Sequence, residues 1–264
     1  MPHPKFKHIR SILPPAPSNI YDSCMIHLRA ATIALLLLAL AEQTSAQIPT
    51  TRPSLTEAET KAGWVLLFDG STTTGWRGLG ADAFPSNRWR IDDYCLHCLG
   101  GEGRTNDIIT TGKYENFELA FQWRVPKAPG NTGVKYRVQE KKGDGFAFGP
   151  EYQIMYDPGV NDKHATGSLY EILPPQNKTL RPLAEFNDSR IKVQGNHVEH
   201  WLNGVKVVEF EFNSDAVKAG IAQSKFKNTD WAKNPLGYIA LQDHHDEAFF
   251  RNIKLRELPA TAQK

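Results

Sequence analysis

The sequence predicts an all-β fold in which two antiparallel sheets pack face to face. Short runs of β-branched and aromatic residues follow one another from Gly63 almost to the C-terminus, and Gly, Pro, Asn and Asp separate them. No long helical periodicity interrupts these runs. Such runs are typical of a sandwich or a barrel, and eleven of them in one domain favour two large sheets packed face to face.

Alternation and turn residues define the individual elements. The run from Phe117 to Val125 alternates apolar with polar or small residues, so that one face of the strand is apolar. Asn203-Gly204 predicts a tight hairpin, because both residues readily take positive φ. The only expected helix of the domain is Ser214 to Ala222. The expected strands are Trp64 to Phe68, Trp89 to Leu96, Phe117 to Val125, Gly133 to Val138, Glu151 to Tyr156, Ser168 to Ile172, Ser189 to Gln194, His197 to Leu202, Val205 to Phe212, Gly237 to Gln242 and Phe249 to Glu257.

Residues 1–46 have the pattern of a leader and signal peptide. A short basic segment after Met25 precedes an apolar run from Ala30 to Ala41, and small residues then favour cleavage after Ala46. The apolar run is too short to span a bilayer comfortably. We therefore expect Met25 to be the true start. We also expect an exported protein, periplasmic or extracellular, that is not inserted in the membrane after cleavage.

The remaining chain is expected to hold one domain. Residues 47–62 are a predicted linker, in which the capping pattern Ser54-Leu55-Thr56-Glu57 indicates one short helical turn. Residues 63–258 form the sandwich and residues 259–264 a tail. A net charge of +2 with interspersed signs predicts no nucleic-acid partner. Cys95 and Cys98 would point to opposite faces of a strand, so we expect buried thiols and no zinc or redox pair.

One polar strand face is the candidate floor of an active site. Alternate positions from Glu151 onward place two carboxylates and a carboxamide on one face: Glu151, Gln153, Met155 and Asp157. The opposite face carries Tyr152, Ile154 and Tyr156, which need a core. A plain strand with a wet outer face is the alternative interpretation.

Further polar and aromatic groups could complete such a site. Lys135 and Arg137 share a face of the preceding strand, and Asp243-His244-His245-Asp246 follows the strand that ends near Gln242. Carboxylates and imidazoles transfer protons, and cationic side chains hold hydroxyls or an oxyanion. Tyr170 and several tryptophans could stack on sugar rings.

Other kinds of site are weaker or absent. A divalent-metal site built from His244, His245, Asp246 and Glu151 stays open, although adjacent histidines point to opposite sides of an extended chain; no cofactor is expected. His164, in a loop after the polar strand, is either an overhanging site residue or a flexible loop residue. The sequence has no nucleophile elbow, phosphate loop or dinucleotide fingerprint, so serine-hydrolase, nucleotide and NAD chemistry have no support.

Five motifs, in order along the chain, resemble the 3-keto-disaccharide hydrolase family, long known only as a domain of unknown function. The resemblance covers about Gly63 to Leu258. The motifs are Gly63-Trp64-Val65-Leu66-Leu67-Phe68-Asp69-Gly70 with Gly75-Trp76, Asn131-Thr132-Gly133-Val134-Lys135-Tyr136-Arg137, Gly149-Pro150-Glu151-Tyr152-Gln153-Ile154, Gly195-Asn196-His197-Val198-Glu199-His200-Trp201-Leu202-Asn203-Gly204, and Leu241-Gln242-Asp243-His244 through Phe250-Arg251-Asn252-Ile253-Lys254.

The resemblance implies a jelly-roll sandwich of the concanavalin A-like lectin/glucanase type that cleaves glycosides already oxidised to a ketone at C3. Such a ketone acidifies the C2 proton, so that a base can remove it, the C1 substituent can leave, and water can add afterwards. Proton transfer would fall to Glu151, or to His244 oriented by Asp246. In the family as the resemblance gives it, Gly stands between these last two, where this chain has His245, so a less tight turn is expected.

The remaining predicted residues would bind the oligosaccharide or glycoside substrate. Lys135 and Arg137 would hold the keto oxygen and hydroxyls. Gln153, Asp157 and Tyr170 would contribute further contacts.

Two rival functions use the same fold. A retaining endo-glucanase needs two carboxylates, as in Glu-x-Asp-x-Glu, but the spaced positions here read Glu151, Gln153 and Met155. Direct hydrolysis would therefore require Asp157 or Asp246 as a replacement. A non-catalytic, lectin-like module would use the same face to bind sugar without chemistry. The number of titratable groups favours an enzyme.

Overall fold

The structure, a computed structural model, describes residues 51–140 and 147–260. It contains the strands β1 (Val65–Leu66), β2 (Trp76–Gly78), β3 (Trp89–Asp92), β4 (Cys95–Cys98), β5 (Ile108–Thr110), β6 (Phe117–Arg124), β7 (Thr132–Val138), β8 (Glu151–Ile154), β9 (Asn187–Gln194), β10 (His197–Leu202), β11 (Val205–Glu211), β12 (Tyr238–Leu241) and β13 (Ala248–Glu257). The predicted leader, its start at Met25 and its cleavage site lie outside the described residues.

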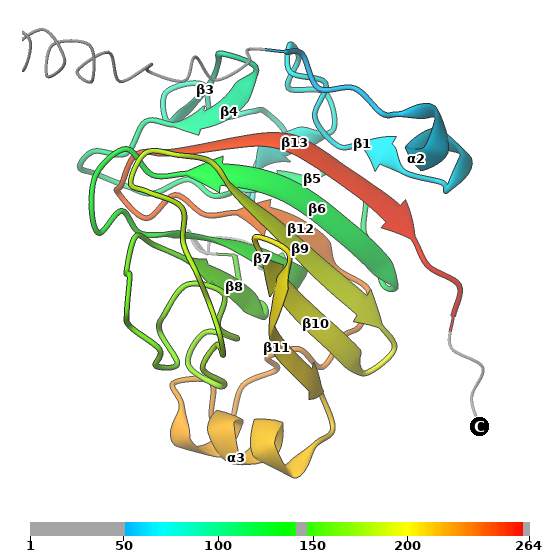
Figure 1. Cartoon of the computed structure of the whole chain (residues 1–264), viewed down its shortest axis with the longest axis vertical. Helices are drawn as coiled ribbons and strands as arrows, with labels where there is room; N and C mark the ends of the chain where they lie inside the picture. Colours follow the sequence, from blue (N-terminus) through cyan, green and yellow to red (C-terminus); the bar gives the residue numbers. More distant parts are fainter. Residues whose placement is uncertain (1–50, 141–146, 261–264) are drawn as a thin grey trace, which may run out of the picture. The chain divides into compact units, whose positions relative to one another are not determined.

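The strands form two antiparallel sheets, which confirms the predicted all-β sandwich (Figure 1). One sheet has eight strands in the order β11-β10-β9-β6-β13-β4-β3, with β1 paired to β13. The other has five, in the order β2-β5-β12-β7-β8. Figure 1 shows the eight-stranded sheet in front of the five-stranded one, so segments far apart in sequence meet in the layer between them.

The core between the sheets is aromatic and hydrogen-bonded. The rings of Phe121 on β6 and Tyr152 on β8 meet edge to face across it, with centroids 5.8 Å apart. Buried hydroxyls need partners. The Tyr152 hydroxyl pairs with Ser189 Oγ at 2.9 Å, and the Tyr136 hydroxyl with His200 Nε2 at 3.0 Å. Burial lowers the pKa of His200 to about 4, so this histidine is a neutral core residue near pH 7.

Several predicted elements differ from the structure in informative ways. The run from Trp89 to Leu96 is a hairpin and not one strand, because Asp93 and Tyr94 take φ of 50° and 57° and turn the chain between β3 and β4. The predicted strand Ser168 to Ile172 makes only isolated bridges, through Leu169. The short strands β2 and β5 are not among the expected elements, since runs of three residues carry little periodicity.

The two helices of the described residues lie at opposite ends of the sandwich (Figure 1). Helix α2 (Glu57–Lys61) begins with a capping box formed by Thr56 and Glu59, and not with the predicted cap at Ser54. Helix α3 (Asp215–Gln223) has Ser214 as its N-cap, in agreement with the prediction. None of the helices in the described part of the chain has the length and apolar character needed to cross a membrane.

The predicted cysteine environment is confirmed. Cys95 and Cys98 are free and buried, and each packs in a different cluster of apolar side chains. Burial raises the pKa of the Cys95 thiol to about 11, which keeps it protonated near neutral pH.

Candidate active site

A cavity of about 400 Å³ lies on the face of the five-stranded sheet that points away from the core. Its floor comes from β7 and β8, because the alternation of β8 sends Tyr152 and Ile154 into the core and Glu151 and Gln153 to the other side. Loops supply its walls. The cavity is lined by Asn131, Lys135, Ala147, Phe148, Gly149, Glu151, Gln153, Tyr170, Lys225, Phe226, Gln242 and His244.

A buried ion pair occupies the floor. Lys135 on β7 lies opposite Glu151 on β8 in the antiparallel register, and Lys135 Nζ is 3.6 Å from Glu151 Oε2. Lys135 Nζ also donates to the carbonyl of Ala147 at 3.1 Å. The predicted neighbourhood of these two residues is therefore confirmed. The predicted wet face is not, because Glu151 is only 7% exposed and the surrounding loops screen it from water.

Asp107 is a second carboxylate behind this pair. It is fully buried and precedes β5, and its two oxygens accept hydrogen bonds from the backbone of Ala147 and Asp243, each at 2.9 Å. Burial raises the pKa of Asp107, whereas the nearby positive charge of Lys135 acts in the opposite direction. Lys135 thus pairs with Glu151 and also acts electrostatically on a second buried acidic residue.

Gly133 leaves the room that the Glu151 side chain needs. A Cβ at this position would lie 2.6 Å from Glu151 Oε1 and 3.0 Å from its Cγ. The clash is with the movable end of a side chain, so the Gly133→Ala protein should fold while its Glu151 carboxylate is displaced. We expect kcat/KM to fall roughly 100-fold with a small change in Tm, because misplacing a reacting group by about 1 Å costs on that order. A large drop in Tm with normal activity per folded molecule would contradict this expectation.

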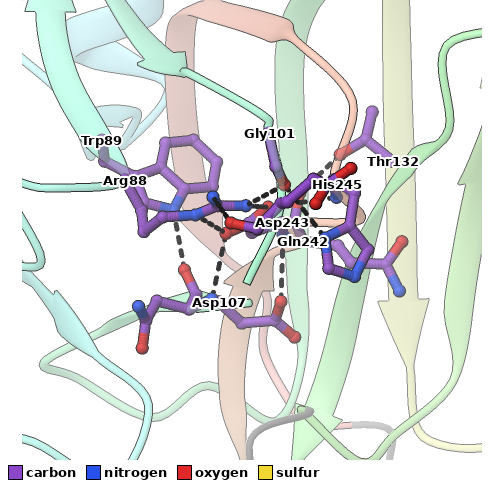
Figure 2. Close-up of polar contacts among 10 residues, drawn as sticks. Arg88, Trp89, Gly101, Asp107, Thr132, Gln242, Asp243 and His245 are labelled. Atoms are coloured by element: carbon purple, nitrogen blue, oxygen red, sulfur yellow. Dashed lines mark hydrogen bonds and ion pairs between the residues drawn. The ribbon is translucent and has the colours of Figure 1, made fainter. Parts of the chain in front are cut away.

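Asp243 directly precedes His244 and is held by several hydrogen bonds; Figure 2 shows it with Arg88, Asp107 and His245. It is fully buried, and Arg88 donates two hydrogen bonds to its carboxylate, from Nε to Oδ2 at 2.7 Å and from Nη2 to Oδ1 at 2.8 Å. Backbone amides of Asn106 and His245 donate to the same carboxylate. Burial alone would raise the pKa of Asp243, but these hydrogen bonds, above all that from Arg88, hold it below its usual value.

His245 occupies a backbone conformation that favours glycine. Its φ is 68°, at the position where the resemblance led us to expect Gly. His245 thus has a backbone conformation that a glycine would also take, and its imidazole Nδ1 lies 3.1 Å from the carbonyl of Gly101. Whether the turn is looser than in the family stays a prediction.

The backbone strain at His245 can be measured with two variants that both lack the imidazole. We expect His245→Gly to be more stable than His245→Ala by about 1 kcal/mol, since only Gly takes positive φ without a Cβ penalty. Chemical denaturation of both proteins measures the difference. Equal stability of the two variants would show that the turn relaxes.

Asp246 serves the site indirectly. Its Oδ2 accepts a hydrogen bond from the backbone amide of Asn131 at 2.8 Å, and Asn131 Oδ1 accepts one from Gln153 Nε2 at 2.9 Å. Asp246 itself does not line the cavity. The predicted pairing with His244 is replaced by a chain of contacts that orients Asn131 and Gln153. His244 is exposed and lies at the edge of the cavity.

Two predicted substrate-binding residues lie elsewhere. Arg137 lies in a bulge where β7 pairs with β12, and its φ of 52° turns it off the face of Lys135. Its Nη2 donates to the carbonyl of Gly195 and its guanidinium lies 4.1 Å from the centre of the Phe212 ring. Asp157 lies beyond the end of β8 and binds Lys178 Nζ at 2.6 Å.

Tyr170 does line the cavity, as predicted. Its ring lies 5.3 Å from that of His164, so this loop histidine supports the tyrosine without itself lining the cavity. Burial, together with the negative charges of Glu151 and Glu171, raises the pKa of the Tyr170 hydroxyl. The hydroxyl is therefore a proton donor in hydrogen bonds near neutral pH.

The backbone next to Tyr170 also closes the edge of the sheet. The amide of Tyr170 donates to the carbonyl of Glu151 at 3.1 Å, and the amide of Gly167 donates to the carbonyl of Gln153 at 2.8 Å. The segment 167–170 thereby pairs with the outer side of β8, the last strand of its sheet.

The residues considered for a metal do not gather around one point. Within residues 51–140 and 147–260, the one group of three close metal-type ligands is His197, Glu199 and Glu209, on β10 and β11. Lys206 Nζ already binds Glu209 at 2.5 Å, and Trp201 Nε1 binds Glu199 at 2.7 Å. These carboxylates are satisfied by the protein, so the group carries no cofactor assignment.

A larger cavity, of about 680 Å³, lies between the segment around Arg52 and the outer face of the eight-stranded sheet. None of the predicted site residues lines it. Its polar side chains largely bind one another, as Gln122 does with Asp188 and Asn252. The smaller cavity is therefore the candidate active site.

Several site residues could not be predicted from the sequence. Asp107 and Arg88 come from loops that precede short strands, and only the structure brings them to the turn after β12. Phe148 and Phe226 belong to loops with no periodicity. Asn131 could have been found, because it opens the same motif that contains Lys135.

Comparisons with known proteins support the resemblance seen in the motifs. Residues 63–256 match the family model described as 3-keto-alpha-glucoside-1,2-lyase-like domain. A 3-keto-disaccharide hydrolase from Bacteroides thetaiotaomicron is 32% identical over 230 residues, which cover 74% of this chain and 79% of that protein. A solved structure of a proposed glycosyl hydrolase from Parabacteroides distasonis ATCC 8503 has a TM-score of 0.72 at 31% identity and covers 79% of this chain and 100% of its own. The chain therefore belongs to the 3-keto-alpha-glucoside-1,2-lyase-like domain family.

Proposed function

We propose that this protein is a glycoside-cleaving enzyme that acts on 3-keto-glycosides, including 3-keto-disaccharides. The observation that carries the proposal is the buried Lys135–Glu151 pair on the floor of a cavity large enough for a sugar ring. It places a carboxylate that can exchange a proton beside a cation that can stabilise an enolate oxygen. The named relative and the family support the same substrate class.

The proposed reaction has two stages. A base removes the C2 proton next to the ketone, the electron pair forms the C1–C2 double bond, and the C1–O bond breaks as the leaving oxygen takes a proton. Water then adds its hydroxyl to C1 and a proton to C2, which gives net hydrolysis. We assign the proton transfers to Glu151 and His244, the keto oxygen to Lys135, and hydroxyl contacts to Gln153 and Tyr170.

Direct hydrolysis in the manner of a retaining glucanase has less support. That mechanism needs a second carboxylate about 5 Å from the first. Asp157 is bound by Lys178 and Asp246 by the amide of Asn131, and neither lines the cavity. Glu151 is the only carboxylate among the residues that line it in the described part of the chain.

The test is aglycone release from a chromogenic 3-keto-glucoside and from its unoxidised parent. We expect the mature protein, residues 47–264, to release the aglycone from the keto compound alone. Parallel reactions with a chelator decide whether a divalent metal is needed. Release from the parent would support the glucanase alternative, and saturable binding of a glycan without any release would support the lectin alternative. Export remains part of the proposal, and the N-terminal sequence of the secreted protein would test it.

A further inference from the structure

One wall of the candidate active-site cavity, formed by Ala147, Phe148, Tyr170, Lys225 and Phe226, differs chemically from the floor. Phe148 and Phe226 meet edge to face with ring centroids 6.2 Å apart, and both line the cavity with Tyr170. Phe226 in turn stacks on Trp231 at 5.3 Å, which holds it in place. This wall thus presents fixed aromatic surfaces, whereas the floor presents a carboxylate, an ammonium group and the carboxamide of Gln153.

Lys225 lies on this wall without an acidic partner. Its Nζ is 4.7 Å from the centre of the Tyr170 ring and 5.5 Å from that of Phe226. No carboxylate of residues 51–140 and 147–260 forms an ion pair with it, and nearby Glu171 is already bound by Lys163. The other lysine of the cavity, Lys135, has its counterion in Glu151. Lys225 therefore offers a positive charge next to aromatic rings.

The wall offers few hydrogen bonds to a ligand. Among these five described residues, Tyr170 and Lys225 have polar groups, a hydroxyl and an ammonium group, whereas the side chains of Ala147, Phe148 and Phe226 are apolar. A sugar ring needs several polar partners for its hydroxyls, whereas a flat aromatic ring needs apolar contact and at most one or two.

We propose that this wall binds the leaving group, and that the preferred leaving group is an aromatic ring that carries a carboxylate. This inference rests on the proposed function, since it names the substrate class of the same cavity. The 3-keto sugar lies on the polar floor, the aromatic ring of the aglycone packs between Tyr170 and Phe226, and its carboxylate pairs with Lys225.

The test compares three proteins on two matched substrates. The substrates are 3-keto-glucosides of 4-hydroxybenzoate and of its neutral amide, and the proteins are the wild type, Lys225→Met and Lys227→Met. Methionine keeps the apolar stem of the lysine, and Lys227 is an exposed control on the same loop. For each protein, kcat/KM on the benzoate substrate is divided by kcat/KM on the amide substrate. Comparing this ratio between the three proteins removes the intrinsic difference in reactivity between the two leaving groups.

We expect Lys225→Met to lower this ratio about threefold to fivefold at low salt, because an exposed ion pair contributes at most about 1 kcal/mol. Lys227→Met should keep the wild-type ratio, and added salt should reduce the wild-type preference. An unchanged ratio in Lys225→Met would overturn the inference while leaving the proposed function standing. If Lys225→Met lowered kcat/KM more on a 3-keto-glucosyl glucuronide than on the hydroxybenzoate glucoside, the inference that the leaving group is aromatic would be overturned.

Binding of free 4-hydroxybenzoate, measured by titration calorimetry, separates the two proposals. Weaker binding of the free acid to Lys225→Met than to Lys227→Met would support the proposed binding site on the aromatic wall. If this result came with no cleavage of any glycoside, the proposed function alone would fail. If the wild type neither cleaves the substrates nor binds the free acid, both proposals are wrong.

Discussion

Glu151→Gln is expected to lower kcat/KM on a 3-keto-glucoside by about 10²- to 10⁴-fold, the usual contribution of a positioned acid or base. Gln has the shape of Glu but does not take up a proton at neutral pH. Lys135 loses its nearest counterion but keeps its hydrogen bond to the carbonyl of Ala147, so the protein should still fold. Steady-state kinetics with the chromogenic substrate and a thermal melt measure the two effects.

Glu185→Gln is the matched control, because Glu185 is exposed and does not line the cavity. It should keep wild-type activity. If Glu151→Gln instead unfolded the protein, or retained full activity when folded, then Glu151 would be a structural residue and the proton transfer would have to be assigned elsewhere.

Arg88→Met is expected to cause the largest loss of stability, about 3–5 kcal/mol, because it leaves the buried carboxylate of Asp243 without its cation. The side chains of this pair are only 9% and 0% exposed. Arg90→Met is the control: Arg90 pairs with Asp92 at the surface, where their side chains are 56% and 46% exposed. Such a pair contributes at most about 1 kcal/mol. Urea unfolding at neutral pH measures both free energies, and similar losses would contradict the expectation.

The same pair predicts a pH dependence. In the wild type the folded-state pKa of Asp243 is lowered, so its contribution to stability is fully present above the unfolded pKa of about 4 and is lost as the pH falls through the folded value. In Arg88→Met the buried carboxyl has lost the group that lowered its pKa. The gap in unfolding free energy between variant and wild type should therefore narrow below about pH 4. A gap that does not vary with pH would show that Asp243 is not the group responsible.

How much of the structure the sequence predicts depends on how far along the chain each sequence pattern extends. Alternation is local, so the sequence alone predicts β8 and the division of Glu151 from Tyr152 between its two faces. Neighbouring motifs then place β7 beside β8, which is why Lys135 is expected next to Glu151. Alternation extends only as far as a strand is regular. Asp157 lies past the end of β8, and the bulge in β7 rotates Arg137 off the expected face.

Long-range partners have no local signal. Arg88 and Asp243 are 155 residues apart, and nothing near either one indicates the other. The aromatic wall also has no local sequence signal, because Phe148 and Phe226 come from separate loops that meet only in the folded chain. Local patterns therefore predict the polar face of β8 that forms the floor of the cavity, whereas the residues that support this face and the aromatic wall depend on tertiary packing.

The pairing of segment 167–170 with β8 also bears on aggregation. An open strand edge exposes unpaired amides and carbonyls that can recruit another chain. Here that edge belongs to the strand that carries Glu151, and the backbone of Gly167 and Tyr170 occupies it. Changes that loosen this segment would therefore expose the strand to intermolecular β-pairing, so the solubility of the protein and the placement of its principal carboxylate depend on the same few backbone hydrogen bonds.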